Sequence, residues 1–261
     1  MTKKRELVEL NQNIHGDLKV VPGAAISQAS KQHIIGVKVN ELGQALSAFP
    51  VFLMRSKQPD SDSPLWALSA ITSFEQNVNL FVVDGQWDSV YVPSAMRTFP
   101  MFLTVAGQGK EGYSVGIDPE SSVFSKESGD ALFDEDGNAT DYLSSVTAQL
   151  DADIKNEVFT YRFTKQLDEL GLIREVNVVL RFADNNEHTL KGLHTINEEK
   201  FNELSDETIL ALRENGFLVS IYAMLFSVFQ VNSLAKRHNL KDGTIKIVDV
   251  KVEPHSQQVA H

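Results

Sequence analysis

The segment GYSVG at 112–116 places Ser114 in the pattern G-x-S-x-G of a catalytic serine. In hydrolases with this pattern, a sharp strand-to-helix turn exposes the serine hydroxyl. Here residues 113–117 alternate as a strand does, so we expect Ser114 to lie inside a strand. Asp184 and His194 follow later in the chain, but their spacing does not select them as partners in a triad. Ser114 is therefore the candidate nucleophile of an alternative hypothesis, a hydrolase.

Two histidines could supply ligands to a metal ion. His188 and His194 are six residues apart, and in a regular strand this even spacing puts both side chains on one face. No third ligand follows from the spacing, so an exposed sheet face is the competing interpretation. His15 and Asp17 match half of a two-histidine, one-carboxylate iron site, but they lie in a polar leading segment. We predict no metal and no cofactor, and a metal enzyme using His188 and His194 is the alternative.

Two loops match ligand-binding patterns only in part. The dinucleotide pattern G-x-G-x-x-G, present as GQGKEG at 107–112, requires a helix after the glycines, whereas strand-like residues follow here. The acidic segment that begins at Asp134 resembles a calcium-binding EF-hand loop, but Ala139 and Ser145 replace the required glycine and glutamate. We interpret the first loop as a glycine-rich hairpin and the second as a turn with a helix cap.

The longest apolar segment, at 217–238, has the pattern of a helix. Its first fifteen residues are apolar on nearly all sides, so the helix must be buried in protein or in lipid. A bilayer span needs about 20 mostly apolar residues, with about 17 as the lower limit, and this run is shorter. We predict the core helix of a soluble domain and no transmembrane segment.

Small and polar side chains form one stripe on this helix, at Ser220, Ala223, Ser227 and Gln230. The stripe could line a groove, and Tyr222 would need a partner for its hydroxyl group if it were buried. The competing interpretation is close packing against another helix, with Gln230 bonded to backbone groups. Our candidates for lining a ligand site are Trp87, Arg97, Tyr222, Ser227 and Gln230.

The order of the expected elements predicts an α+β fold. A polar leading segment at 1–17 precedes a β-rich half at 18–125 and a connecting loop at 126–139. Residues 140–252 form a helix-rich half with a hairpin, the buried helix and a final strand, and 253–261 form a tail. We predict that these parts make one structural domain.

The β-rich half contains a repeat, in which SAFPVFL at 47–53 returns as RTFPMFL at 97–103. Each copy follows a short helical stretch and leads into a strand that turns and returns. Proline cannot donate to a strand ladder, which suits the entry of a strand. Duplication of a helix–strand–strand unit explains the repeat, and so does coincidence in a chain with 15 phenylalanines.

Local signals predict several further elements. The Asp84-Gly85 pair predicts a hairpin turn, a helix is expected at 141–170, and a second hairpin at 175–194. Asn197 and Ser205 are placed to cap two short helices before the long apolar one.

The composition limits the classes of partner. A net charge of −11 disfavours nucleic acid and anionic membranes, which attract basic proteins. The absence of cysteine excludes disulfides, thiolate catalysis and cysteine-bound metals. The basic start of the chain has no apolar region after it, so it is not a secretory signal and we expect the protein in the cytoplasm.

Blocks of residues between about 20 and 238 share one pattern with a known family. In the first part they are NLF at 79–81, Gly85, Trp87, YVP at 91–93, Arg97, FP at 99–100, FDEDG at 133–137, GL at 192–193 and NE at 197–198. In the second part they are LSDE at 204–207, Leu212, Gly216, IYA at 221–223 and LFS at 225–227. As a set they resemble the bacterial SapC family.

The resemblance implies an association with bacterial surface layers or with nutrient uptake, and it carries no catalytic residues. A peptide-transport permease label, used for some members, conflicts with the predicted absence of membrane spans. We therefore expect a soluble binding or accessory protein that works through a partner protein or a small ligand. The residues do not set the oligomeric state, and a homodimer is compatible with them.

Overall fold

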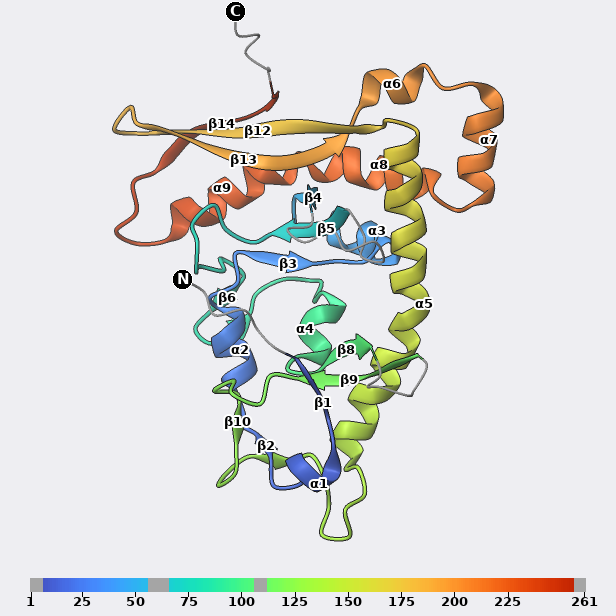
Figure 1. The fold of residues 1–261 in the computed structure, drawn as a ribbon. Coiled ribbons are helices and arrows are strands. Elements are labelled where there is room, and N and C mark those ends of the chain that lie inside the picture. Colours follow the sequence, from blue (N-terminus) through green and yellow to red (C-terminus); the bar gives the residue numbers. More distant parts are fainter. Residues whose placement is uncertain (1–6, 56–65, 106–111, 256–261) are drawn as a thin grey trace, which may run out of the picture. The chain divides into compact units, whose positions relative to one another are not determined.

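The computed structural model describes residues 7–55, 66–105 and 112–255 (Figure 1). Its helices and strands confirm the predicted α+β class. The chain forms two compact units, which are described separately here. The first comprises Met1–Lys31, Val82–Asp88 and Ser94–Lys155, and the second Gln32–Phe81, Ser89–Pro93 and Asn156–His261. The predicted loop at 126–139 lies within the first unit, and the prediction of one structural domain stays a prediction.

The first unit contains small antiparallel sheets, ordered β1-β9-β8, β10-β2-β11 and β6-β7. Their strands are β1 (Val8–Glu9), β2 (Lys19–Val20), β6 (Val82–Val83), β7 (Gln86–Trp87), β8 (Phe102–Val105), β9 (Tyr113–Ile117), β10 (Phe124–Ser125) and β11 (Asp130–Ala131). Its helices are α1 (Gln12–His15), α2 (Ala24–Ala29), α4 (Ser94–Thr98) and the first part of α5 (Asp141–Glu169).

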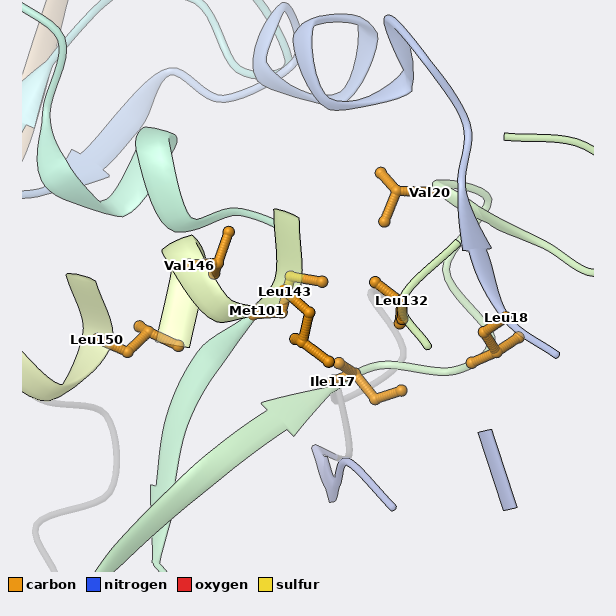
Figure 2. Close-up of a cluster of buried hydrophobic side chains, with 8 residues drawn as sticks. All are labelled: Leu18, Val20, Met101, Ile117, Leu132, Leu143, Val146 and Leu150. Carbon is orange, nitrogen blue, oxygen red and sulfur yellow. The ribbon is translucent and has the colours of Figure 1, made fainter. Parts of the chain in front are cut away.

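Apolar side chains from strands, loops and helix α5 form the core of this first unit (Figure 2). Ile117 from β9 meets Leu143 from α5, and both are almost fully buried. The other members of the cluster are Leu18, Val20, Met101, Leu132, Val146 and Leu150.

The second unit is built on a six-stranded antiparallel sheet with the order β14-β12-β13-β4-β5-β3. The strands are β3 (Ile34–Gly36), β4 (Val51–Arg55), β5 (Trp66–Ile71), β12 (Ile173–Phe182), β13 (Glu187–Ile196) and β14 (Ile247–Pro254). The helices are η1 (Val39–Glu41), α3 (Leu42–Ala45), the end of α5, α6 (Glu198–Asn202), α7 (Asp206–Glu214), α8 (Leu218–Ser227) and α9 (Gln230–Leu240).

Helices α8 and α9 differ from the predicted single buried helix. A tight turn separates α8 from α9, and in it Phe229 N donates to Phe226 O and Val231 N donates to Val228 O. One side of α8 packs into the unit, whereas Val219 remains 75% exposed and Phe226 60%. The prediction of burial on all sides was therefore wrong, because apolar composition alone does not show which sides a neighbour covers.

The run Leu218–Leu240 is long and apolar enough to cross a membrane by length and composition, and 39% of its most apolar stretch is buried. Core helices of soluble proteins meet the same criterion, so the finding is weak evidence for a span.

Several local predictions are confirmed. Asp84 and Gly85 both have positive φ angles, 50° and 73°, and join β6 to β7 as the hairpin signal predicts. Asn197 accepts a hydrogen bond from Lys200 N and so caps α6, and Ser205 accepts one from Thr208 N and caps α7. Helix α5 covers the range predicted for it.

The two copies of the repeat adopt the predicted helix–strand–strand order. The first copy gives α3, β4 and β5, and the second gives α4, β8 and β9, with an antiparallel strand pair in each. Part of the leading segment belongs to the fold, since Val8 and Glu9 pair with β9 and His15 is buried. The Nδ1 atom of His15 accepts a hydrogen bond from Asn11 N at 3.0 Å.

Candidate ligand-binding site

A pocket of about 700 Å³ lies in the second unit, on the face of the sheet that also carries α9. Its walls are mostly apolar and come from β3, β4, β12, β13, β14 and the segment after β5. The apolar lining residues are Ile34, Met54, Phe74, Leu180, Phe182, Leu190, Leu193 and Ile247. The polar ones are His33, Glu75, Gln76, His188, Lys191 and His238.

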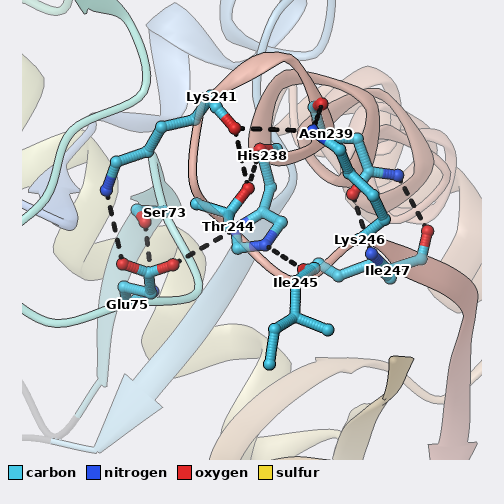
Figure 3. Close-up of polar contacts among 9 residues, drawn as sticks. All are labelled: Ser73, Glu75, His238, Asn239, Lys241, Thr244, Ile245, Lys246 and Ile247. Carbon is cyan, nitrogen blue, oxygen red and sulfur yellow. Dashed lines mark hydrogen bonds and ion pairs between the residues drawn. The ribbon is translucent and has the colours of Figure 1, made fainter. Parts of the chain in front are cut away.

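His238, near the end of α9, is the most buried polar group of this pocket (Figure 3). Its Nε2 atom lies 3.1 Å from Ile245 O, and because a carbonyl only accepts, Nε2 carries the proton and donates. Its Nδ1 atom lies 3.3 Å from Glu75 Oε1, an ion-pair distance without the alignment of a hydrogen bond. Lys241 Nζ lies 3.6 Å from the other carboxylate oxygen of Glu75.

The turn between α9 and β14 fixes this arrangement (Figure 3). Asn239 bonds Ile247 twice, since its Oδ1 accepts from Ile247 N at 2.7 Å and its Nδ2 donates to Ile247 O at 2.8 Å. Thr244 Oγ1 donates to Lys241 O at 2.8 Å. These bonds join the end of the helix to the start of the strand, so His238 faces the pocket from a rigid support.

The remaining polar groups differ in environment. Burial lowers the pKa of His33, which therefore favours the neutral imidazole. His188 and Lys191 lie on β13 and are exposed. Within the described part of the chain, the ammonium group of Lys191 has no ion-pair partner.

The geometry of His238 does not suit a general base. A general base must present a free ring nitrogen to the substrate. In His238 one nitrogen is committed to the carbonyl of Ile245 and the other faces Glu75. What the pocket offers a ligand is mostly apolar walls with a polar edge.

The model of the SapC family matches residues 10–234 of this chain. The chain belongs to the SapC family. No curated protein and no solved structure matches it. The match includes His33, Glu75 and Lys191 of the pocket, whereas His238 lies beyond the matched range of the SapC model.

His188 and His194, which their even spacing predicts on one face of a strand, lie on opposite faces of β13. Leu193 pairs with Val176 and Leu190 with Val178, so β13 has one residue more than β12 between these pairs. The bulge includes Gly192, whose φ of 76° suits glycine, and the extra residue reverses the alternation of sides. His188 therefore lines the pocket, whereas the ring of His194 packs edge-on against Trp66 at 4.7 Å.

His194 is half-buried. Burial lowers its pKa, and the carboxylate of Glu175, which is its cross-strand partner, opposes this effect in part. Its Nδ1 atom is buried and has no hydrogen-bond partner among the described residues. No group of three or more histidine, aspartate or glutamate side chains in the described ranges could hold a metal ion.

Ser114 lies inside strand β9, as the alternation of its neighbours predicts. Its Oγ atom donates a hydrogen bond to Glu9 Oε1 at 3.0 Å. Of the dinucleotide-like segment 107–112, residues 107–111 lie outside the described residues. The Asp134 loop is a turn, in which the Oδ1 atom of Asp134 accepts from the backbone nitrogens of Asp136 and Asn138.

Two of the predicted lining residues on α8 and α9 make internal bonds. Ser227 is fully buried, and its Oγ atom accepts from Val51 N at 3.2 Å and donates to Met224 O at 2.8 Å. Gln230 Nε2 donates to Leu46 O at 3.0 Å, as the packing interpretation expects.

The other predicted lining residues lie elsewhere. Tyr222 is 45% exposed and stacks on Phe226. Trp87 on β7 is half-buried, and Arg97 on α4 is exposed, both in the first unit. Among the described residues that line the pocket, His188 is the one that the sequence predicted as a site residue. Sequence reasoning missed His33, Glu75, Lys191 and His238, because they are far apart in the chain and share no spacing pattern.

Proposed function

We propose that this chain is a bacterial binding or accessory protein whose ligand is a mostly apolar small molecule with one anionic group. The observation that carries the proposal is the pocket between the six-stranded sheet and α9. Its volume of about 700 Å³ falls within the range of about 300–1,000 Å³ typical of small-molecule sites, which are also mostly apolar with a few polar groups. Lys191 at its rim supplies a cation for an anionic group.

The wider role is also a proposal. The family resemblance supports a link to the bacterial surface layer or to nutrient uptake, with the protein acting from the cytoplasm as an accessory factor. The net charge of −11 supports partners other than nucleic acid. Cell fractionation tests the role: we expect the protein in the cytosolic fraction, and recovery in the surface-layer fraction would contradict the cytoplasmic accessory role.

Calorimetric titration with two surfactants of similar chain length and opposite charge tests the ligand class. Decanoate carries a carboxylate and decyltrimethylammonium a cation. We expect decanoate to bind with one-to-one stoichiometry and more tightly than its cationic counterpart. Leu190→Trp, which fills the pocket, should abolish binding. Lys191→Gln should weaken it by about twofold to fivefold, because an exposed ion pair contributes little.

Lys236→Gln is the matched control for Lys191→Gln. Lys236 is exposed on α9 and does not line the pocket, so its loss should leave the affinity for decanoate unchanged. Unchanged binding in Leu190→Trp, or no binding of decanoate at all, would refute the pocket as the ligand site. Equal affinity for the cationic surfactant would refute the preference for an anion.

A further inference from the structure

Helix α8 presents an uncovered apolar face. Val219, Tyr222 and Phe226 follow one another at steps of three and four residues, which puts them on one side of α8, and Phe229 follows in the turn to α9. Phe226 is 60% exposed and Phe229 70%. Single exposed apolar side chains are ordinary on a protein surface, whereas several on one helix face mark an interaction site.

This face continues into a second hollow of the same unit. A groove of about 340 Å³ lies where α8, α9 and the end of the sheet meet. Phe229 belongs to both the exposed face and the groove, so the two form one surface. The other apolar lining residues are Val176, Ile196, Leu225, Val228, Val231, Val250, Val252 and Pro254.

Two polar atoms in the groove have no hydrogen-bond partner among the described residues. Arg174 and Thr195 are cross-strand neighbours on β12 and β13, and both line the groove. Arg174 Nε and Thr195 Oγ1 are buried and have no hydrogen-bond partner among the described residues, and Thr195 is only 6% exposed. Buried polar groups of this kind are rare in native proteins and point to a ligand atom.

The missing partner is an uncharged acceptor. Arg174 Nε can only donate and Thr195 can donate as well, so the ligand must supply an oxygen that accepts. The positive charge of Arg174 is balanced by Glu199, whose Oε1 lies 3.6 Å from Nη1. A neutral carbonyl therefore fits better than a carboxylate.

The helices that neighbour this surface are acidic: Phe201 of α6 packs against Tyr222, and α7 contacts α8. Helices α6 and α7 with their caps carry Glu198, Glu199, Glu203, Asp206, Glu207 and Glu214, against two cations, Lys200 and Arg213. Glu198 itself lines the groove. The excess of acid repels an anionic membrane and attracts basic side chains.

We propose that this surface binds a basic amphipathic helix of a partner protein. Its apolar side chains would cover the exposed face of α8 and enter the groove, as in other helix-in-groove complexes. The last carbonyls of a helix have no partner within that helix, so one of them can accept from Arg174 Nε and Thr195 Oγ1. Lysines and arginines beside the apolar face would oppose the acidic helices α6 and α7.

Fluorescence anisotropy with two synthetic helical peptides tests the proposal on the full chain. One peptide carries leucines at i, i+3, i+4 and i+7 and lysines on the opposite side of the helix, and the other replaces each lysine with glutamate. We expect the leucine–lysine peptide to bind. The double variant Phe226→Ser with Phe229→Ser should weaken this binding by at least about tenfold, because apolar anchors dominate such interfaces. Thr195→Val should weaken it as well, by about threefold or more.

Val90→Ser is the matched control, since Val90 is 90% exposed and lies outside the groove. It should leave the affinity unchanged. Equal binding of the leucine–glutamate peptide, or unchanged affinity in the double variant, would overturn the proposal. A dimer in sedimentation velocity that the double variant abolishes would assign the surface to a second copy instead. Binding to phosphatidylcholine vesicles that the same variant abolishes would assign it to lipid.

The test is separate from that of the small-molecule pocket. Phe226 and Phe229 do not line the pocket of His238, so the double variant should bind decanoate as the parent chain does. Loss of peptide binding with intact decanoate binding supports this surface whatever the outcome for the pocket.

Discussion

Ser227 is the position where the packing of α8 can be tested most directly. The side chain is fully buried, and its Oγ atom is the hydrogen-bond partner of Val51 N at the start of β4. Val51 is itself fully buried. In Ser227→Ala the backbone N–H group of Val51 would therefore remain buried without an acceptor.

The expected loss can be worked from this geometry. Leaving a buried donor unsatisfied costs about 1–3 kcal/mol in free energy of unfolding. Alanine is the better helix former by about 0.5 kcal/mol, which offsets part of that loss. Ser220→Ala supplies the matched control, because Ser220 is buried in the same helix and its side chain makes no hydrogen bond among the described residues. The difference between the two variants should be about 1–3 kcal/mol.

Thermal unfolding followed by circular dichroism measures this difference. A loss of about 2 kcal/mol lowers the Tm of a domain of this size by about 4–8 °C. We expect Ser220→Ala to stay close to the parent chain and Ser227→Ala to fall below it by that amount. If the two variants unfold at the same temperature, Ser227 does not hold β4 and the groove-lining interpretation of the polar stripe regains support.

Two further predictions concern burial and pH. Phe217→Ala should lower the free energy of unfolding by about 3–5 kcal/mol, because that ring is 1% exposed and packs against Phe159 and Phe163. Phe226→Ala at the exposed face should lower it by less than about 0.5 kcal/mol. Similar losses for the two variants in urea unfolding would contradict the exposed face. Burial holds the pKa of His194 below its ordinary value of 6.5, so the folded state binds fewer protons than the unfolded chain and this residue's contribution to stability is lost as the pH falls below 6.5. His194→Gln should therefore reduce the fall in Tm between pH 6.5 and roughly pH 5, and parallel Tm profiles of variant and parent would refute this.

Elements with local signals could be predicted from the sequence. Asn197 and Ser205 cap their helices as their positions indicate, because a cap needs only the side chain and the next three residues. The Asp84-Gly85 turn is equally local. Helix α5 and the β12–β13 hairpin follow from periodicity and from turn residues between them.

The relation of His188 to His194 shows where such reasoning fails. Even spacing keeps two residues on one face only while the strand is regular. Gly192 lies between them, and an isolated glycine in a strand often marks a bulge. That signal was available in the sequence, and it would have predicted opposite faces for the two histidines.

The candidate pocket could not have been found in this way. It joins His33 near one edge of the sheet to His238 on α9, and Glu75 and Lys191 come from other elements. Their meeting depends on the strand order β14-β12-β13-β4-β5-β3, which places segments distant in sequence on one face. No local sequence pattern predicts that strand order.

The pocket and the proposed docking surface lie on the same face of β12. Leu180 and Phe182 line the pocket, whereas Arg174 and Val176 line the groove, and even spacing keeps all four on one side of the strand. Helix α9 contributes to both, through His238 at one end and Val231 near the other. Because none of the described residues lines both hollows, a substitution in one leaves the walls of the other intact. The two binding proposals can therefore fail independently, although both depend on how α9 lies across the sheet.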